Sequence, residues 1–175
     1  ECLIEHVIVG GVHGVFILGT TGEAQSISFG LRKEMIQQSA QILKGRLPLL
    51  VGISDTSLVD SVSLANLAAD NGADAVVSAP PYYYATGQPE LAEYYEQLLP
   101  QLPLPLFLYN MPTHTKVSFA PSTIRRIAEN SKVIGFKDSS ANGGYFQSVL
   151  YEFRDRPDFS LFVGPEEMMA ESVLM

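Results

Sequence analysis

The stretch Val133-Ile134-Gly135-Phe136-Lys137-Asp138 joins an uninterrupted apolar run to charged residues at its end. Short runs of Val, Ile and Phe without polar alternation are typical of strands that are buried on both faces of a parallel sheet. Lys137 continues this run without a break, so it lies where the strand leaves the sheet. Parallel β/α folds carry their chemistry at that end of their strands. The stretch therefore predicts a buried parallel strand that ends in Lys137.

Five further apolar runs have the same character, and helical patterns separate them. The predicted strands are Gly14–Gly19, Leu49–Ile53, Ala75–Ala79, Leu106–Tyr109, Val133–Lys137 and Phe159–Val163. Apolar residues at three- and four-residue spacing predict a helix before the first strand and helices between the strands. The predicted helices are Leu3–Gly10, Phe29–Leu43, Leu58–Asn71, Pro89–Leu99, Pro121–Asn130 and Tyr145–Arg154. Because each connection is long enough for a helical crossover, we expect the strands to be parallel.

Local signals mark where several of these helices begin and end. Ser57 precedes one predicted helix as an N-cap, and Ser118 together with Pro121 precedes another. Gly45 and Gly72 follow two predicted helices, at the position where a left-handed residue commonly ends a helix. These signals support the alternation of strand and helix.

Two architectures fit this alternation, an open doubly wound sheet and a (β/α)8 barrel. An open sheet concentrates its chemistry at one switch point, whereas a barrel collects it from the C-terminal ends of many strands. Polar or aromatic residues follow five of the predicted strands: Gly19-Thr20-Thr21-Gly22-Glu23, Pro80-Pro81-Tyr82-Tyr83-Tyr84, Tyr109-Asn110-Met111-Pro112, Lys137-Asp138-Ser139-Ser140 and Gly164-Pro165-Glu166-Glu167. We therefore expect one α/β domain over residues 1–175, a (β/α)8 TIM barrel from helix 1 to helix 7. Strand 1, strand 8 and the C-terminal helices would lie outside this chain.

The composition argues against several classes of partner. Hydrophobic residues make up 46% of the chain, and 11 basic against 19 acidic residues leave a formal charge of −8. Without a run rich in Lys and Arg, neither nucleic acid nor a membrane surface is an expected partner. The single cysteine, Cys2, cannot form a disulfide within the chain, which favours a reducing, cytoplasmic compartment. No apolar run reaches the roughly 18 residues of a membrane-spanning helix.

Other site classes lack their sequence signatures. His6, His13 and His114 are scattered without the ligand spacing of a zinc site. No Gly-x-Ser-x-Gly elbow indicates a serine hydrolase. Neither a phosphate-loop pattern nor Gly-x-Gly-x-x-Gly follows a strand, which argues against a nucleotide or dinucleotide enzyme.

Lys137 is the most informative residue of the chain. Strand alternation places it on the same face as Gly135, which in a barrel would be the interior, with room beside the lysine. A strand-end lysine can also reach water or pair with Asp138, and the pattern alone weighs these roles about equally against a catalytic one. An amine at an apolar barrel mouth is expected to be a usable nucleophile, and such amines condense with ketones to form Schiff bases.

Two further motifs fit the same chemistry. Tyr109 also ends a buried strand, and its phenol could move a proton to and from the amine, although packing is the commoner role of a tyrosine. Gly19-Thr20-Thr21-Gly22 offers hydroxyls and backbone N–H groups that suit a carboxylate. Taken alone, that sequence is more often a plain turn. Each motif is therefore weak by itself.

As an ordered set, four motifs closely resemble the dihydrodipicolinate synthase / N-acetylneuraminate lyase family. They are Gly19-Thr20-Thr21-Gly22-Glu23, Pro81-Tyr82-Tyr83, Tyr109-Asn110-Met111-Pro112 and Gly135-Phe136-Lys137-Asp138. Their order and separations fit the family across nearly the whole chain. The resemblance implies a class I pyruvate-dependent aldolase or lyase on a (β/α)8 barrel. It also implies a homo-oligomer, commonly a tetramer built as a dimer of dimers.

The resemblance implies roles for individual residues. Lys137 matches the lysine that forms a Schiff base with pyruvate, and Tyr109 matches the tyrosine that relays protons. Thr20 and Tyr83 match the other members of a proton-relay triad. In the family, the tyrosine at the position of Tyr83 reaches across a dimer interface into the site of the neighbouring subunit.

The pyruvate carboxylate site is implied by the same resemblance. Thr21 matches its side-chain ligand, and the backbone amides around it, from Gly19 to Gly22, complete the cradle. A protonated imine is an electron sink beside the reacting carbon, so a carbon–carbon bond can break to, or form from, an enamine. This chemistry needs no metal and no organic cofactor, and we expect neither.

Two positions bear on the second substrate. Synthases of the family usually carry an arginine two residues past the proline of the Tyr-Asn-x-Pro motif, and this chain has His114 there. A histidine lacks the bidentate fork that suits a carboxylate. Lys116 could replace that arginine, although an exposed loop charge is its commoner role. Gly164-Pro165-Glu166-Glu167 resembles the acidic loop with which the lyases hold sugar hydroxyls, although favourable charge in the first turn of a helix explains it equally well.

We therefore expect a Schiff-base lyase or aldolase that makes or cleaves a 2-oxo acid through pyruvate, with a hydroxylated or sugar-derived aldehyde as partner. The closest alternative is 4-hydroxy-tetrahydrodipicolinate synthase, which condenses pyruvate with aspartate semialdehyde. An alternative of another class is a catalytically inactive, ligand-binding barrel. The intact set of Lys137, Tyr109, Thr20 and Thr21 argues against that last alternative.

Overall fold

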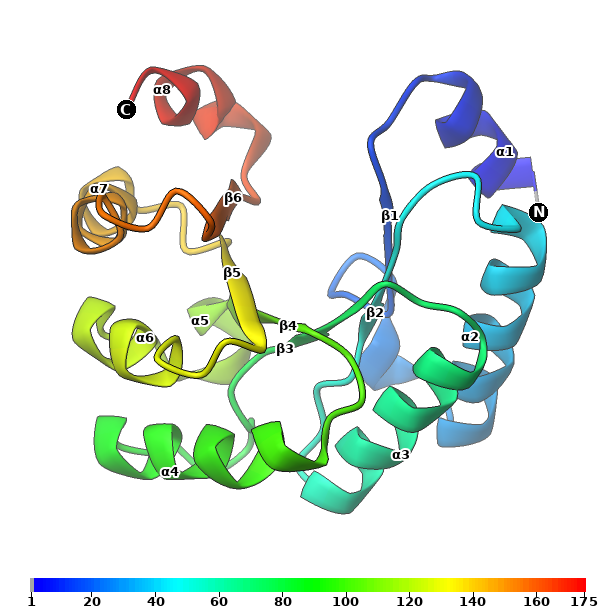
Figure 1. Cartoon of the computed structure of the whole chain (residues 1–175), viewed down its shortest axis with the longest axis horizontal. Helices are drawn as coiled ribbons and strands as arrows, with labels where there is room; N and C mark the ends of the chain where they lie inside the picture. Colours follow the sequence, from blue (N-terminus) through cyan, green and yellow to red (C-terminus); the bar gives the residue numbers. More distant parts are fainter. Residues whose placement is uncertain (1) are drawn as a thin grey trace.

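Six parallel strands lie side by side in chain order in the computed structural model, which describes residues 2–175 (Figure 1). They are β1 (Val15–Ile17), β2 (Leu49–Gly52), β3 (Ala75–Ser78), β4 (Leu106–Asn110), β5 (Val133–Asp138) and β6 (Ser160–Val163). Every neighbouring pair is parallel. The six predicted strands are therefore confirmed, with bounds that shift by one or two residues.

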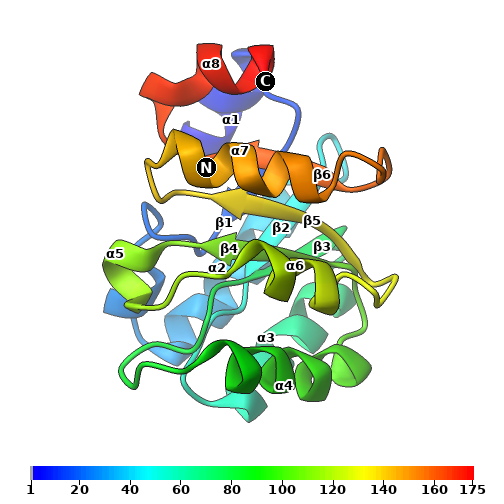
Figure 2. The same cartoon turned by 90° about the vertical axis from the view of Figure 1, so that its left-hand side faces the viewer.

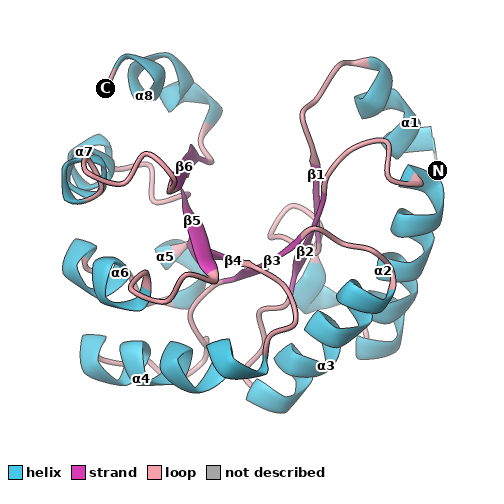
Figure 3. Cartoon of the chain, in the orientation of Figure 1, coloured by secondary structure: helices cyan, strands magenta, loops and turns pink. Residues whose placement is uncertain are grey.

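The helices lie on the outer side of the curved sheet, and the strands surround a concave interior (Figure 3). They are α1 (Cys2–Val9), α2 (Phe29–Leu43), α3 (Leu58–Asp70), α4 (Gln88–Leu98), α5 (Pro112–Thr115), α6 (Pro121–Ile127), α7 (Gly143–Glu152) and α8 (Met169–Leu174). Three 3-10 turns are η1 (Ala24–Ser26), η2 (Leu99–Gln101) and η3 (Glu166–Met168). Because the strand order never reverses and the helices cover one side, the chain forms a parallel half-barrel rather than a doubly wound sheet.

Two apolar layers hold the half-barrel together. The larger layer lies between the sheet and the outer helices, of which α4, α6 and α7 lie side by side (Figure 2). Its fully buried side chains include Ile36, Leu64, Leu91, Tyr95 and Phe136. Burial of each large apolar side chain contributes about 1.5–3 kcal/mol. A smaller cluster lies on the concave side and contains Ala75, Val77, Ala79, Phe107 and Tyr109.

The predicted helix signals have mixed outcomes. The Ser57 hydroxyl accepts from the backbone N–H of Asp60, so Ser57 caps α3 as predicted. Gly45 and Gly72 both have positive φ, 68° and 77°, and each follows the C-cap residue of its helix, α2 and α3. Ser118 is not a cap: Ala120 is the N-cap residue of α6, without a side-chain bond, and Pro121 begins the helix. The pre-set φ of proline replaces the missing cap there.

Gly135 has a different role from the predicted one. A Cβ at this position would lie 2.5 Å from the backbone oxygen of Ser160 and would also collide with the ring of Phe107. The space beside Gly135 is therefore filled by Phe107, its partner across β4 and β5, and is not left open for Lys137. The glycine allows three strands to pack closely under the lysine.

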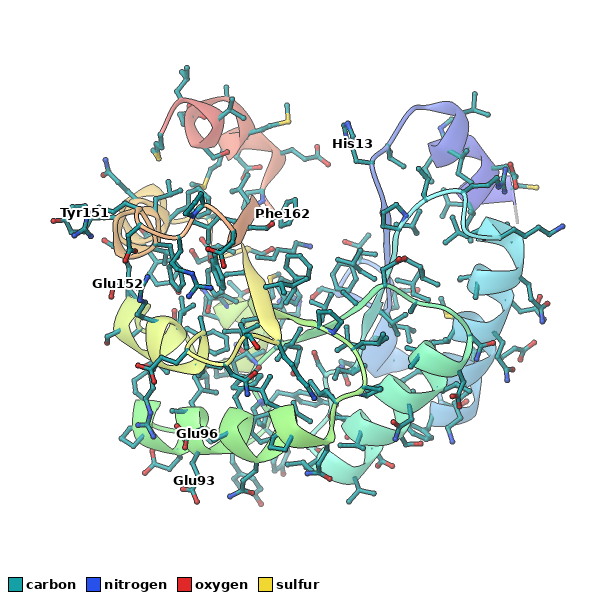
Figure 4. All side chains as sticks on the ribbon, viewed as in Figure 1. His13, Glu93, Glu96, Tyr151, Glu152 and Phe162 are labelled. Carbon is teal, nitrogen blue, oxygen red and sulfur yellow. The ribbon has the colours of Figure 1, made fainter. Side chains whose placement is uncertain are left out.

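Burial on both faces was expected for every strand, and it is wrong for β6. Its residues are exposed or half-buried, because β6 forms an edge of the sheet within residues 2–175. Phe162 is 51% exposed and points into the concave interior (Figure 4). Its ring centre lies 5.7 Å from that of Phe107. By contrast, Glu93, Glu96 and Tyr151 lie on the outer helices (Figure 4).

Candidate active site

The pairing of β4 with β5 sets Lys137 directly beside Tyr109. The Nζ atom of Lys137 lies 4.8 Å from the centre of the Tyr109 ring and 4.9 Å from that of Phe16, which comes from β1. The two rings pack edge to face, with centres 6.1 Å apart. A cation at Nζ, whether ammonium or protonated imine, is stabilised by the faces of such rings.

Thr20 approaches Lys137 and Tyr109 from the other side of the half-barrel, where β1 forms the edge of the sheet. Its hydroxyl oxygen lies 3.2 Å from the phenol oxygen of Tyr109, and either group can donate the hydrogen bond. Thr20 belongs to the loop after β1, Tyr109 to β4 and Lys137 to β5. Three of the four residues with predicted catalytic roles are therefore brought together at the C-terminal ends of three strands.

The loop after β1 also contains Gly19, Thr21 and Gly22. A Cβ at Gly19 would lie 2.9 Å from the Phe16 ring, and one at Gly22 would lie 3.2 Å from the backbone nitrogen of Leu18. Both glycines therefore allow a tight turn over the end of β1. Thr20 and Thr21 are exposed at its crest, toward the carboxyl ends of the strands.

A cavity of about 330 Å³ opens beside this cluster. Phe16 and Tyr109, the two rings that touch Lys137, form part of its wall, together with Gly19. Besides Tyr109, its polar side chains come from the segments that follow β1 to β4: Thr20, Glu23, Gln25, Ser26, Ser54, Tyr82, His114 and Thr115. The wall that residues 2–175 provide is thus rich in hydroxyl, carboxamide and carboxylate groups, and it contains neither lysine nor arginine.

A buried polar network on the other face of the sheet fixes the ends of β4 and β5. Asn110 and Asp138 are fully buried register partners, and the Asn110 amide donates to the Asp138 carboxylate at 2.8 Å. The hydroxyl of Ser140 donates to the same carboxylate at 2.8 Å, and the backbone N–H of Phe119 donates to Asn110. Because Tyr109 and Lys137 directly precede these two residues, the network holds them in register. Sequence reasoning did not assign a role to this network. Asn110 and Asp138 each directly follow a predicted strand, and that position is the signal by which they could have been found.

The remaining sequence-predicted residues lie apart from this cluster. Tyr83 has φ 85° and is 83% exposed, and it is not part of the cavity wall within one chain. Glu166 and Glu167 are exposed in η3. Gly164 packs so closely on Ser139 that any Cβ would collide with that side chain, and its N–H donates to the Asp138 carbonyl at 2.7 Å.

The loop after β4 places His114 and Lys116 differently. His114 lines the cavity, and its Nδ1 atom lies 2.9 Å from the hydroxyl oxygen of Thr113. Lys116 ends α5 with φ 61°, and its ammonium donates to the Thr113 carbonyl at 2.8 Å. The short helix α5 was not predicted, because four residues are too few to show a helical period.

Parallel strands in chain order, with a lysine, a tyrosine and a threonine gathered at their carboxyl ends, form a parallel β/α half-barrel with an amine at its mouth. The chain belongs to the dihydrodipicolinate synthetase family, whose sequence model matches residues 1–175. This confirms the resemblance seen in the four motifs. Among residues 2–175, no helix is both long enough and apolar enough to cross a membrane.

Several relatives show how the family varies. The probable 2-dehydro-3-deoxy-D-pentonate aldolase YjhH of Escherichia coli K12 is 32% identical over 173 residues, which cover 98% of this chain and 58% of that protein. The structure of dihydrodipicolinate synthase from the commensal bacterium Bacteroides thetaiotaomicron is 76% identical, with a TM-score of 0.95 over 98% of this chain and 58% of that one. The E. coli K12 prophage protein YagE, solved in complex with pyruvate, is 28% identical, with a TM-score of 0.95 over 99% and 59%. The chain thus spans less than two thirds of each relative.

Proposed function

We propose that the protein is a class I Schiff-base lyase or aldolase, which forms or cleaves a 2-oxo acid through an imine between pyruvate and Lys137. The observation that carries this proposal is the position of Nζ, 4.8 Å from the Tyr109 ring, with the Tyr109 hydroxyl bonded to Thr20. A nucleophilic amine and a proton-transfer group thus share one apolar wall. The pyruvate complex of the relative YagE supports the choice of 2-oxo acid.

The chemistry follows from this arrangement. The Lys137 amine adds to the keto carbon of pyruvate, and loss of water gives a protonated imine. Loss of a methyl proton gives an enamine, whose carbon attacks the aldehyde while a proton reaches the aldehyde oxygen. Hydrolysis then releases the product and the free amine. In the reverse direction, the imine of a longer 2-oxo acid loses its aldehyde and leaves the same enamine.

Tyr109 and Thr20 are proposed as the proton relay of these steps. Their 3.2 Å contact allows a proton to pass between the two hydroxyls, and Tyr109 is the one beside the amine. Thr21, with backbone amides from Gly19 to Gly22, is proposed to receive the pyruvate carboxylate. Backbone N–H groups in a turn before a helix suit an anion.

For the second substrate, we propose a hydroxylated or sugar-derived aldehyde. Glu23, Gln25 and His114 line the cavity, and no lysine or arginine of residues 2–175 does so. A carboxylate acceptor would meet Glu23 without a fixed cation, whereas hydroxyls would find several hydrogen-bond partners. Glu166 and Glu167, with Gly164 at the end of β6, are proposed to extend this hydroxyl-binding surface. The name of the E. coli relative, a probable 2-dehydro-3-deoxy-D-pentonate aldolase, supports this class of substrate.

One observation favours a second candidate, 4-hydroxy-tetrahydrodipicolinate synthase. The solved structure from Bacteroides thetaiotaomicron is 76% identical to this chain and is described as a dihydrodipicolinate synthase. In that reaction, the enamine would attack aspartate semialdehyde. The two candidates share Lys137, Tyr109 and the threonine loop, and they differ only in the aldehyde.

We also propose that the complete protein closes as a (β/α)8 barrel, to which residues 1–175 contribute one domain from helix 1 to helix 7. It would act as a cytoplasmic homotetramer, a dimer of dimers, in which Tyr83 completes the site of a neighbouring subunit. The 83% exposure of Tyr83 in the single chain supports a contact with a partner. An edge strand as exposed as β6 also needs a neighbour.

The covalent step has a direct test on the full-length protein. Borohydride reduction in the presence of pyruvate should trap one adduct, which peptide mapping should locate on Lys137. The variant Lys137→Ala should give no adduct, because the nucleophile is gone. Lys116→Ala, which removes an exposed loop lysine near the cavity, should label like wild type. Equal labelling of Lys137→Ala and wild type would refute the proposed function.

A further inference from the structure

The loop that carries Thr20 and Thr21 has a backbone conformation that its residues do not favour. Leu18 at its start has φ 57° and Glu23 at its end has φ 52°, in the left-handed region that residues other than glycine rarely adopt. Such conformations persist only where neighbouring contacts over-determine them. The bond between Thr20 and Tyr109 holds the crest of the loop. A second contact is needed at its far end.

Gln25, directly after the loop in η1, makes that contact. Its Nε2 donates to the backbone oxygen of Ser54, after β2, at 3.0 Å. Its Oε1 accepts from Arg32 Nη2 at 3.3 Å and from the hydroxyl of Tyr82, after β3. One side chain therefore joins the loops after β1, β2 and β3 to helix α2.

A buried ion pair orients this glutamine. Arg32 Nη1 lies 2.8 Å from Asp55 Oδ2, and the two side chains are only 10% and 14% exposed. The other carboxylate oxygen of Asp55 accepts from the backbone N–H of Ser57 at the start of α3. Ion pairs of this kind add little net stability, but they fix geometry. Because a guanidinium only donates, the carboxamide oxygen of Gln25 must face Arg32 and its amide must face Ser54.

Tyr82 completes the arrangement as a donor. Burial raises the pKa of its phenol, and the nearby charge of Asp55 raises it further, so the hydroxyl stays protonated. The phenol and the guanidinium thus both donate to one oxygen of Gln25. Gln25 and Tyr82 also line the cavity, so the arrangement reaches the site itself.

We propose that Gln25 is a positioning residue for pyruvate. Held by Arg32 and Asp55, it fixes the loop of residues 18–23 so that Thr21 and the backbone amides around it are preorganised for the carboxylate of the 2-oxo acid. This inference rests on the proposed function. Gln25 holds the end of the loop beside the carboxylate site, whereas Thr20 keeps its separate bond to Tyr109, so loss of Gln25 acts on pyruvate affinity far more than on turnover at saturation.

The test compares Gln25→Met with Gln37→Met in the full-length protein. Methionine keeps the length of the side chain but forms none of these bonds, and Gln37 is an exposed glutamine of α2. Trapping of the Lys137 adduct is measured against pyruvate concentration, together with KM and kcat. Gln25→Met should raise the half-saturating concentration about five- to tenfold, as expected for the loss of one or two net hydrogen bonds. Gln37→Met should match wild type, and kcat should change much less than KM.

A double-variant cycle shows whether Gln25 acts through its partners. Tyr82→Phe removes one of the same hydrogen bonds, so its effect combined with Gln25→Met should be smaller than the sum of the two. Gln25→Glu keeps both acceptor bonds, but it replaces the donor to Ser54 with a carboxylate oxygen that faces that carbonyl. Its half-saturating pyruvate concentration should therefore also exceed that of wild type. If Gln25→Met fails to fold, this variant decides the matter.

The outcomes separate the two proposals. A wild-type protein that forms no pyruvate adduct would overturn the proposed function, and this inference with it. Normal trapping in wild type with an unchanged pyruvate dependence in Gln25→Met would overturn the positioning role alone. Strictly additive effects of Gln25→Met and Tyr82→Phe would do the same, and so would a wild-type pyruvate dependence in Gln25→Glu.

Discussion

At the scale of single residues, the charge that faces the aldehyde separates the two candidate reactions. His114 lines the cavity, and the resemblance described above implies an arginine at this position in most synthases. An arginine there offers two parallel N–H donors to a carboxylate, which a histidine does not. We therefore expect the reaction with a hydroxylated acceptor to depend little on residue 114, and the reaction with aspartate semialdehyde to depend on it strongly.

His114→Arg should therefore raise kcat/KM for condensation with aspartate semialdehyde by about tenfold to a hundredfold, the worth of a charged hydrogen bond. It should leave the cleavage of a hydroxylated substrate such as 2-dehydro-3-deoxy-D-pentonate nearly unchanged. Steady-state kinetics of wild type and His114→Arg on both substrates measure this. A wild-type protein that already prefers aspartate semialdehyde would show that the synthase candidate is right.

Single residues differ in how far the sequence predicts them. Apolar runs end at or directly before Lys137, Tyr109 and Thr20, and polar residues at such positions indicate a site. The structure brings the three side chains together. Gln25 and Arg32 gave no such signal, because their contacts join loops that are far apart in the chain. Long-range side-chain bonds follow from the packing of whole elements, which periodicity does not encode.

At the scale of elements, β5 depends on close packing against both of its neighbours. Gly135 pairs with Phe107 of β4 on one side and Ser160 of β6 on the other. A methyl group at Gly135 would lie 2.5 Å from the backbone oxygen of Ser160, and a backbone atom cannot rotate away. The strands would have to separate directly below Lys137.

Gly135→Ala should therefore lower the free energy of unfolding by about 1–3 kcal/mol, the usual cost of an overpacked core. It should also reduce imine formation, since Lys137 is two residues further along the same strand. Gly144→Ala is the matched control, because its nearest neighbour would lie at an ordinary 3.5 Å. Denaturant unfolding measures the free energy of unfolding of both variants and of wild type, and only Gly135→Ala should show the loss. Equal stability of Gly135→Ala and wild type would contradict the packing described here.

The elements themselves are predicted well where periodicity is long. Helix α2 has the predicted bounds, because 15 residues show the apolar spacing clearly and Ser28 caps its start. Helix α6 ends three residues earlier than predicted, at Ile127, since its last turn relaxes into a connecting turn before β5. Helix α5 was missed because it is a single turn. Errors thus gather at element ends, where local hydrogen bonds rather than spacing decide.

At the scale of the whole molecule, the half-barrel leaves Tyr83 without a place in the site of its own chain. The ring of Tyr83 packs on that of Tyr84, with centres 4.9 Å apart, and the two side chains are 83% and 77% exposed. Two large exposed aromatic rings on one loop are typical of a protein interface. The parallel order of the strands follows from the pattern within one chain. A contact between subunits depends on the surface of a second copy, which the pattern of one chain does not describe.

A mixing experiment tests whether two subunits share each site. Lys137→Ala lacks the amine of its own site, and Tyr83→Phe lacks only the phenol hydroxyl that the neighbour would use. Tyr109→Phe, expected to lose roughly two to four orders of magnitude in turnover, is the control because Tyr109 and Lys137 serve the same site.

In a mixed dimer of Lys137→Ala and Tyr83→Phe, one site combines an intact Lys137 from one chain with an intact Tyr83 from the other. Random exchange of equal amounts makes half of the dimers mixed, so activity should return to about a quarter of the wild-type value. Mixing Lys137→Ala with Tyr109→Phe should restore nothing, because every site then carries one of the two lesions. The measurement is turnover after denaturation and joint refolding. If Tyr83→Phe is inactive alone and neither mixture restores activity, with dimers present, then Tyr83 acts in the site of its own chain and the sites are not shared.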